Sequence, residues 1–159
     1  MSEGRLNAGW IDLQVNGYKG VDFSGVGLTV EDVKRVSREL LEHGVQGYCP
    51  TLITSPMKVY ERNLPILARA MNFDEGAQIL GIHVEGPFLS PEDGCRGFHP
   101  KKHIQRPSIE TFERFQALSK DSISILTLDP SQEGALEVID HVVRNTAVTV
   151  SMGHHYSER

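Results

Sequence analysis

Cysteine, long apolar runs and clustered positive charge are all scarce in this sequence. Only Cys49 and Cys95 are present, far apart and without a CxxC pair, which excludes a disulfide framework and a zinc knuckle and favours a reducing, cytosolic setting. The amino-terminal MSEGRLNAG has no apolar signal-peptide core, and no run approaches a membrane span, so we expect neither secretion nor membrane insertion. The net charge of -5 comes without a basic block, which argues against nucleic acid as partner and favours a small solute.

The remaining composition is that of one globular domain, with 39% hydrophobic and 23% charged residues in a chain of 159. Apolar runs and helix-start signals alternate along the chain. The patterns predict strands at residues 10–15, 45–53, 78–85, 123–128 and 147–152. They predict helices after the N-cap Thr29, over 55–71, after Ser108 and over 132–145. This order of strands and helices is typical of a parallel sheet covered by helices.

Two folds fit that alternation, a doubly wound open sheet and part of a (β/α)8 barrel. The first strand is not followed by the phosphate-binding GxGxxG pattern, which weakens the dinucleotide-binding alternative. In both folds ligands meet the carboxyl ends of the strands. Polar residues stand at those ends: Gln14, Asn16, Thr51, Thr54, His83, Glu85, Asp129, His154 and His155.

Spacing along the strands sharpens the prediction of a site. Residues two apart in a strand share a face, so Gln14 and Asn16 point one way, as do His83 and Glu85. A carboxylate and an imidazole from different strands suit zinc or another first-row divalent ion. A catalytic ion commonly takes three protein ligands, and only two obvious ones are present here.

Five ordered motifs, WIDLQVNGYKGVDFS, CPTLITS, GIHVEGPFLS, RGFHP and VSMGHH, resemble the strand-end motifs of the N-acetylglucosamine-6-phosphate deacetylases of the amidohydrolase superfamily. The resemblance covers roughly residues 9–155. It implies a metal-dependent amide hydrolase that releases acetate and glucosamine 6-phosphate. It also implies a partial (β/α)8 TIM-type barrel, with about five parallel strands and intervening helices.

The resemblance further assigns roles to particular residues. Glu85, in the HxEGP motif, and His154, in the SxGH motif, match ligands of one divalent ion, which the resemblance implies to be zinc. His99 and Phe98 match substrate-binding positions for an amino-sugar phosphate. Gln14 and Asn16 match the QxN that replaces the metal-binding HxH, and we assign them to substrate binding as well.

Other family features are not matched. The general acid/base aspartate and the second ligand histidine are expected beyond Arg159, so we expect no catalytic residue within the chain and no turnover by it alone. We interpret residues 1–9 as disordered or a remnant of a small β-domain and residues 10–159 as the amino-terminal part of a truncated barrel. Such a half-barrel would expose strands 10–15 and 147–152 and self-associate. The full-length form is expected to be a cytoplasmic homo-oligomer.

Simpler interpretations of these residues stay open. Glu85 could be a solvated carboxylate, His155 could replace His154, and Gln14 and Asn16 could only satisfy buried backbone groups. His83 is interpreted as a core histidine that orients Glu85 through a hydrogen bond. The role of Asp129, where the family usually has a different residue, is left open. Two other functions remain: another amidohydrolase, although those usually begin with HxH, or a non-catalytic metal or sugar-phosphate binding fragment.

Overall fold

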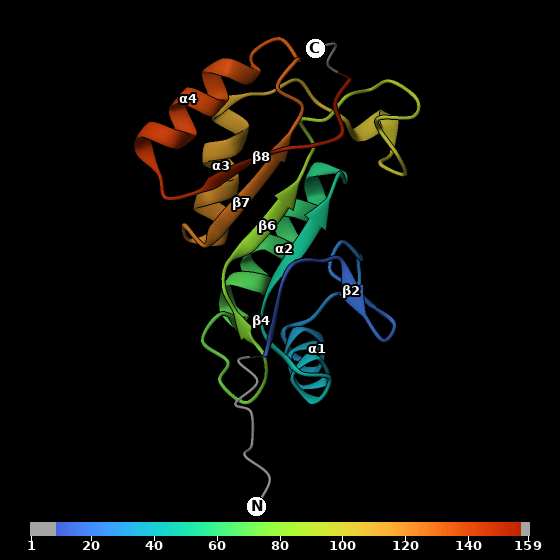
Figure 1. Cartoon of the computed structure of the whole chain (residues 1–159), viewed down its shortest axis with the longest axis vertical. Helices are drawn as coiled ribbons and strands as arrows, with labels where there is room; N and C mark the ends of the chain where they lie inside the picture. Colours follow the sequence, from blue (N-terminus) through green and yellow to red (C-terminus); the bar gives the residue numbers. More distant parts are fainter. Residues whose placement is uncertain (1–8, 157–159) are drawn as a thin grey trace, which may run out of the picture.

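Five parallel strands joined by helices form a half-barrel in the computed structural model, which describes residues 9–156 (Figure 1). The neighbouring strands, in the order of the sheet, are β1 (Trp10–Val15), β4 (Val45–Ile53), β6 (Ile82–Glu85), β7 (Ile123–Leu128) and β8 (Thr149–Met152). A two-residue strand, β5 (Gln78–Ile79), pairs with β4 beside β6. The predicted partial (β/α)8 barrel is therefore confirmed. The interpretation of residues 1–9 falls almost wholly on residues outside the described range.

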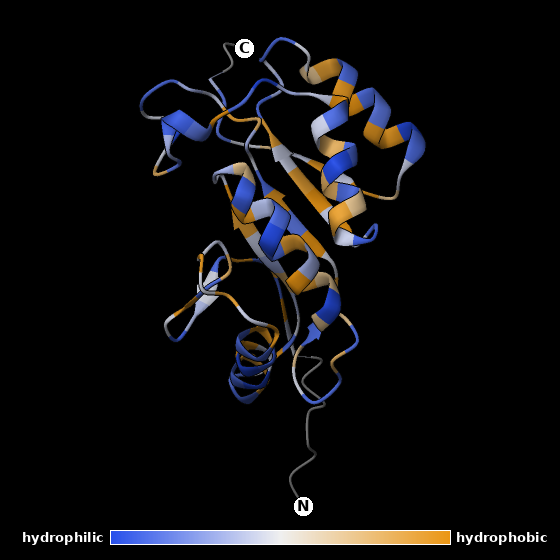
Figure 2. Cartoon of the chain, turned by 180° about the vertical axis from the view of Figure 1, so that it is seen from behind, coloured by the Kyte–Doolittle hydropathy of each residue, from blue (hydrophilic) through white to orange (hydrophobic). Residues whose placement is uncertain are grey.

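The helices lie between successive strands and contact one another in chain order. They are α1 (Val30–Glu42), α2 (Met57–Ala70), α3 (Ile109–Ser119) and α4 (Ala135–Asn145), with a 3-10 turn, η1 (Lys101–His103), in the long loop after β6. In Figure 1, α2 and α3 lie behind the sheet, and in Figure 2, seen from behind, they lie in front of it. The outward side of α2 in Figure 2 is largely hydrophilic, which fits a helix that packs its other side on the sheet.

Capping residues fix where two of the helices begin, as the sequence predicted. The Thr29 side chain accepts from the backbone N–H of Asp32 at 3.1 Å, and the Asp32 carboxylate accepts from the Thr29 N–H at 3.1 Å. Ser108 caps α3 through its side chain, which accepts from the backbone N–H of Thr111. Each cap satisfies N–H groups that the first helical turn leaves without an intrahelical acceptor.

The largest departures of the structure from the predicted elements are at three places. The strand predicted over 78–85 is two strands, because Gly81 has a φ of +147° and a Cβ there would lie 2.4 Å from the Ser124 side chain. α4 begins at Ala135 rather than at 132, after the left-handed Gly134. The turn predicted after the first strand contains a short antiparallel hairpin of β2 (Gly17–Tyr18) and β3 (Val21–Asp22).

The two faces of the sheet differ in chemistry. Leu52, Val84 and Leu126 are fully buried in the apolar core, whereas the alternate residues His83 and Thr127 bond to each other across strands. The register aligns the strand ends, with Ile53 opposite Glu85 and Glu85 opposite Thr127. Side chains at the ends of β4, β6 and β7 are therefore brought to one level.

The outer strands leave apolar side chains exposed. Trp10, Ile11 and Leu13 on β1 are more than half exposed, as is Met152 on β8. β1 and β8 are the two ends of the strand order among the described residues, so each has one edge without a partner strand there. Among the described helices, none combines the length and apolar character required to cross a membrane.

Candidate functional site

A cavity of about 300 Å³ opens at the carboxyl ends of the strands. β1 brings Gln14 to it, β6 brings Glu85, the loop after β6 brings Phe98 and His99, and the turn after β8 brings His154. All six residues predicted from the sequence line this one cavity: Gln14, Asn16, Glu85, Phe98, His99 and His154. Their placement together follows from the parallel sheet, whose strand ends meet at one rim.

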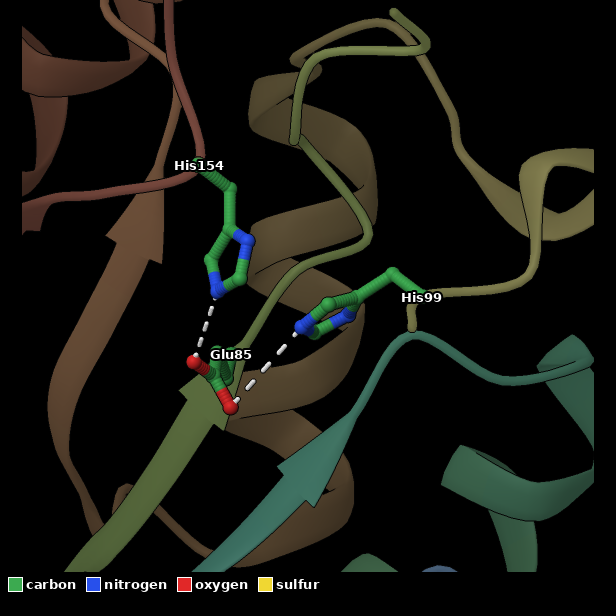
Figure 3. A group of neighbouring side chains, drawn as sticks. All are labelled: Glu85, His99 and His154. Carbon is green, nitrogen blue, oxygen red and sulfur yellow. Dashed lines mark hydrogen bonds and ion pairs between the residues drawn. The ribbon is translucent and has the colours of Figure 1, made fainter. Parts of the chain in front are cut away.

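Glu85, His99 and His154, which all line the cavity, form a cluster with metal-ligand spacing (Figure 3). One ligand atom from each residue lies within 4.8 Å of the other two. His154 Nε2 is 3.1 Å from Glu85 Oε1, and His99 Nε2 is 4.0 Å from Glu85 Oε2. Glu85 and His99 are buried at 6% and 5% exposure. A carboxylate so deep in a protein needs hydrogen-bond donors or a cation close to it.

The orientation of His154 is set by the backbone. His154 Nδ1 lies 2.9 Å from the carbonyl oxygen of Cys95, and because a carbonyl only accepts, Nδ1 carries the proton. A neutral His154 then presents the bare lone pair of Nε2 to the Glu85 carboxylate. Two acceptors 3.1 Å apart repel unless a proton or a cation lies between them. Donation of the other ring N–H to a backbone carbonyl is the usual arrangement for a metal-binding histidine.

His154 itself has an unusual backbone, with a φ of +53°. Its carbonyl accepts from the backbone N–H of Ser90 at 3.1 Å, which ties the end of β8 to the loop after β6. Left-handed backbone at a residue other than glycine costs free energy and is found most often at functional sites. The conformation turns the imidazole back over Glu85.

His99 uses its ring nitrogens in the opposite way to His154, with Nδ1 as the acceptor. Its Nδ1 accepts from the backbone N–H of Thr54 at 3.4 Å and lies 2.9 Å from the Thr54 hydroxyl. With Nδ1 as acceptor, the proton of the neutral ring sits on Nε2, which faces Glu85. Burial is the largest cause that lowers the pKa of His99, and the neighbouring His154 lowers it further, so the neutral ring is favoured. His99 is thus arranged as a hydrogen-bond donor toward the cavity.

Thr54 keeps this position because the next strand end leaves room for it. Gly86 has a φ of +96°, and a Cβ there would lie 2.2 Å from the Thr54 hydroxyl oxygen. Thr54 stood among the polar residues at the predicted rim, but no pattern in the sequence predicted that it orients His99. That role depends on a loop of the chain 45 residues away folding over β4.

Gln14 contacts the candidate ligand directly. Its Nε2 donates to Glu85 Oε1 at 2.9 Å, so Oε1 is shared between Gln14 and His154. The alternative in which Gln14 only satisfies backbone groups is not what the structure shows. Asn16 lines the cavity, and Phe98 stands fully exposed at its mouth.

His83 differs from the prediction that it orients Glu85. Its Nδ1 lies 3.1 Å from the carbonyl oxygen of Leu13, and its Nε2 lies 2.7 Å from the Thr127 hydroxyl. Both ring nitrogens therefore face partners on β1 and β7 rather than the Glu85 carboxylate. Burial is the main cause that lowers the pKa of His83, while the charge of Glu85 acts in the opposite sense.

Asp129 lies at the end of β7 but has a local task. Its carboxylate accepts from the backbone N–H of Ser131 at 2.8 Å and from the Ser131 hydroxyl at 2.6 Å. This is the pattern of an aspartate that closes its own turn. The role of Asp129, which the sequence left open, is therefore to stabilise the turn that leads to α4.

Comparisons with known proteins test the resemblance found in the sequence. The chain is 40% identical over 152 residues to the N-acetylglucosamine-6-phosphate deacetylase of Bos taurus, a match that covers 94% of this chain and 36% of that protein. The resemblance is confirmed. An N-acetylgalactosamine-6-phosphate deacetylase of Escherichia coli O157:H7 is 31% identical over 150 residues, which cover 91% of this chain and 37% of that protein.

Solved structures agree with the sequence relatives. The crystal structure of N-acetyl-D-glucosamine-6-phosphate deacetylase from Mycobacterium smegmatis matches with a TM-score of 0.78 at 26% identity, over 94% of this chain and 37% of that one. A mutant of that enzyme, in complex with N-acetyl-D-glucosamine-6-phosphate, matches equally well. No protein-family model matches the chain. The chain spans a little over a third of the length of the curated relatives that it matches.

Proposed function

We propose that this chain supplies the metal-binding and part of the substrate-binding surface of an N-acetylglucosamine-6-phosphate deacetylase. The observation that carries the proposal is the opposed orientation of two histidines around Glu85. His154 has Nδ1 on the Cys95 carbonyl and turns Nε2 to the carboxylate, whereas His99 has Nδ1 on the Thr54 N–H and turns Nε2 into the same cavity. From the similarity to deacetylases of several organisms we infer the reaction, which is hydrolysis of the acetamide group.

The residues present fit one divalent ion, and we propose zinc. The donor set is one carboxylate and one imidazole whose second nitrogen is already held by a backbone carbonyl. Nitrogen and oxygen donors of this kind suit zinc. When bound, such an ion supplies Lewis acidity, which polarises the acetamide carbonyl and makes water a nucleophile near neutral pH.

The side chains of this chain have separable tasks in the proposal. Glu85 and His154 hold the ion, and Gln14 fixes the Glu85 carboxylate through a 2.9 Å hydrogen bond. His99, with its proton on Nε2, donates to the acetamide oxygen, where negative charge develops during attack. Phe98, exposed at the mouth, offers an apolar face to the sugar ring, and Asn16 offers an amide beside it.

Proton transfer is the step that this cavity does not provide. Glu85 is the one carboxylate among the described residues that line it, and as a metal ligand it is not free to act as the general base. The missing general acid/base typically costs about 10²–10⁴-fold in rate. We therefore expect the chain by itself to bind the ion and the substrate weakly and to release no measurable acetate.

The substrate class is an N-acetylated amino-sugar phosphate, and two compounds of this class are candidates. The relatives include deacetylases named for the glucosamine and for the galactosamine compound. We favour N-acetylglucosamine 6-phosphate, because the deacetylase of Bos taurus named for it is 40% identical to this chain, against 31% for the galactosamine enzyme. We also propose a reducing cytoplasmic location, consistent with the two free cysteines, and a homo-oligomeric full-length form.

Calorimetry on the zinc-loaded chain tests the proposal. N-acetylglucosamine 6-phosphate is expected to bind more tightly than N-acetylgalactosamine 6-phosphate, and a His99→Leu variant is expected to weaken the binding of both. A chain with His99 intact that binds zinc but neither sugar phosphate would contradict the substrate assignment. A chain that binds neither zinc nor sugar would contradict the whole proposal.

A further inference from the structure

β1 contains a bulge next to the proposed site. Asp12 pairs with Tyr48 and Val15 pairs with Pro50, so β1 takes three steps where β4 takes two. The extra residue falls at Leu13–Gln14. A bulge removes backbone groups from the ladder and turns side chains to new directions, which is why bulges often lie beside active sites.

The backbone groups freed by this bulge have specific partners. The Gln14 N–H donates to the carboxylate of Asp12 at 3.0 Å. The Leu13 carbonyl lies 3.1 Å from His83 Nδ1, which must be the donor because the carbonyl has no hydrogen. His83 thus contributes the hydrogen bond that the regular pairing of β1 with β4 does not supply at this point.

The other side of the His83 ring is held as well. Nε2 lies 2.7 Å from the hydroxyl of Thr127 on β7, and with the proton on Nδ1 the hydroxyl donates to it. The imidazole therefore links β1 to β7 across β6, and it is buried at 4% exposure. Because both of its nitrogens are held, the ring fixes the position of the Leu13 carbonyl oxygen. Gln14 is the next residue along the chain, so its backbone is held by the same contact.

We propose that His83 is a positioning residue that holds the β1 bulge and thereby aims the Gln14 amide at Glu85. The inference rests on the proposed metal site, because its importance for function comes through Glu85. His83 does not touch the ion or the substrate in this scheme. It acts through the backbone carbonyl of Leu13 and, through that carbonyl, on Gln14, the next residue.

Two variants of similar size separate the proposal from a general packing role. His83→Asn keeps an amide N–H near the position of Nδ1 and loses the acceptor for Thr127. His83→Gln keeps an acceptor near the position of Nε2 and loses the donor for the Leu13 carbonyl. Gln14→Leu and the double variant Gln14→Leu/His83→Gln complete a double-mutant cycle, which measures whether the two residues act through one interaction.

The first readout is the affinity of the full chain for Co²⁺, measured by calorimetry. Residues that orient a metal ligand typically change metal affinity by about 10–100-fold. We expect a loss of about 10-fold for His83→Gln and of less than about 3-fold for His83→Asn. In the Gln14→Leu background, His83→Gln should have no further effect beyond about 2-fold.

The second readout needs no metal. The side-chain amide of Gln14, assigned by its absence in Gln14→Leu, is expected at a hydrogen-bonded, slowly exchanging position in the NMR spectrum of the metal-free wild-type chain. The signal should stay there in His83→Asn and move to the free-amide position in His83→Gln. This measurement remains informative if the wild-type chain does not bind Co²⁺, an outcome that would refute the proposed metal site alone.

Four results would overturn the inference. One is an equal loss of Co²⁺ affinity in the Asn and Gln variants, which would indicate packing rather than the Leu13 hydrogen bond. Another is additive losses in the double variant. The third is a Gln14 amide signal that does not respond to His83→Gln. Loss of folded structure in both single variants, seen by circular dichroism, would likewise assign His83 to the core and not to positioning.

Discussion

The substitution Glu85→Gln removes one negative charge from the proposed metal site and almost nothing else. Glutamine has the shape of glutamate, and its carbonyl oxygen can still accept from Gln14, which lies 2.9 Å from Glu85 Oε1. The residue is 6% exposed, so little solvent is present to compensate for the lost charge. The variant should therefore fold as the wild-type chain does and differ from it in affinity for a cation.

The expected magnitude follows from the geometry of the cluster. A unit charge and a divalent ion about 2.1 Å apart, the zinc–oxygen distance, attract by about 16 kcal/mol at an effective dielectric constant of 20. The desolvation that binding demands of the carboxylate and the ion offsets most of that attraction. A net loss of about 3 kcal/mol, or roughly 100-fold in affinity, is what we expect. Because two ligands hold zinc only weakly, such a loss would take binding below detection.

Zinc titration by calorimetry checks this prediction. The matched control is Glu92→Gln, which removes the same charge from an exposed position in the loop after β6. An exposed charge is largely screened by salt, so the control should bind zinc within about 2-fold of the wild-type chain. Unchanged zinc affinity in Glu85→Gln, or equal losses in the two variants, would refute the assignment of Glu85 as a ligand.

Three further predictions concern other parts of the chain. Burial raises the pKa of Tyr48 to about 12 from 10.0, so the stability it contributes is complete below pH 10 and is lost as the pH rises toward 12. Urea unfolding should show a smaller alkaline loss for Tyr48→Phe than for wild type, and equal losses would contradict this. The β1 edge, which has no partner strand within residues 9–156, should drive self-association, and Trp10→Lys should shift sedimentation toward monomer; an unchanged distribution would exclude this edge. Thr54→Val removes the hydroxyl 2.9 Å from His99 Nδ1 and should lower sugar-phosphate affinity by about 10-fold with zinc affinity unchanged; equal losses would make His99 a ligand.

Most of the fold could be predicted from local signals in the sequence. Thr29 and Ser108 cap their helices because the side chain that accepts the N–H lies three residues away, a distance that the sequence displays directly. The break between β5 and β6 could not be predicted in this way. Gly81 takes its unusual backbone where Ser124, on a strand more than 40 residues later, leaves no room for a side chain.

The site shows the same division between local and distant causes. The period of two in a strand was enough to place Glu85 at the rim and to bring Gln14 to the same cavity. The partners of the two histidines were not predictable, because the Cys95 carbonyl and Thr54 reach them only after the long loop has folded over the strand ends. The bulge in β1 was also not predictable, and without it His83 was expected to bond to Glu85.

Anomalous diffraction from crystals of the zinc-soaked chain tests the central claim most directly. We expect a zinc peak in the strand-end cavity, at about 2.0–2.2 Å from a Glu85 oxygen and from His154 Nε2. His154 Nδ1 should remain on the Cys95 carbonyl, and His99 Nε2 should stay outside ligand distance. A peak bound to His99 with His154 turned away, or a peak on a cysteine sulfur and none in the cavity, would contradict the account.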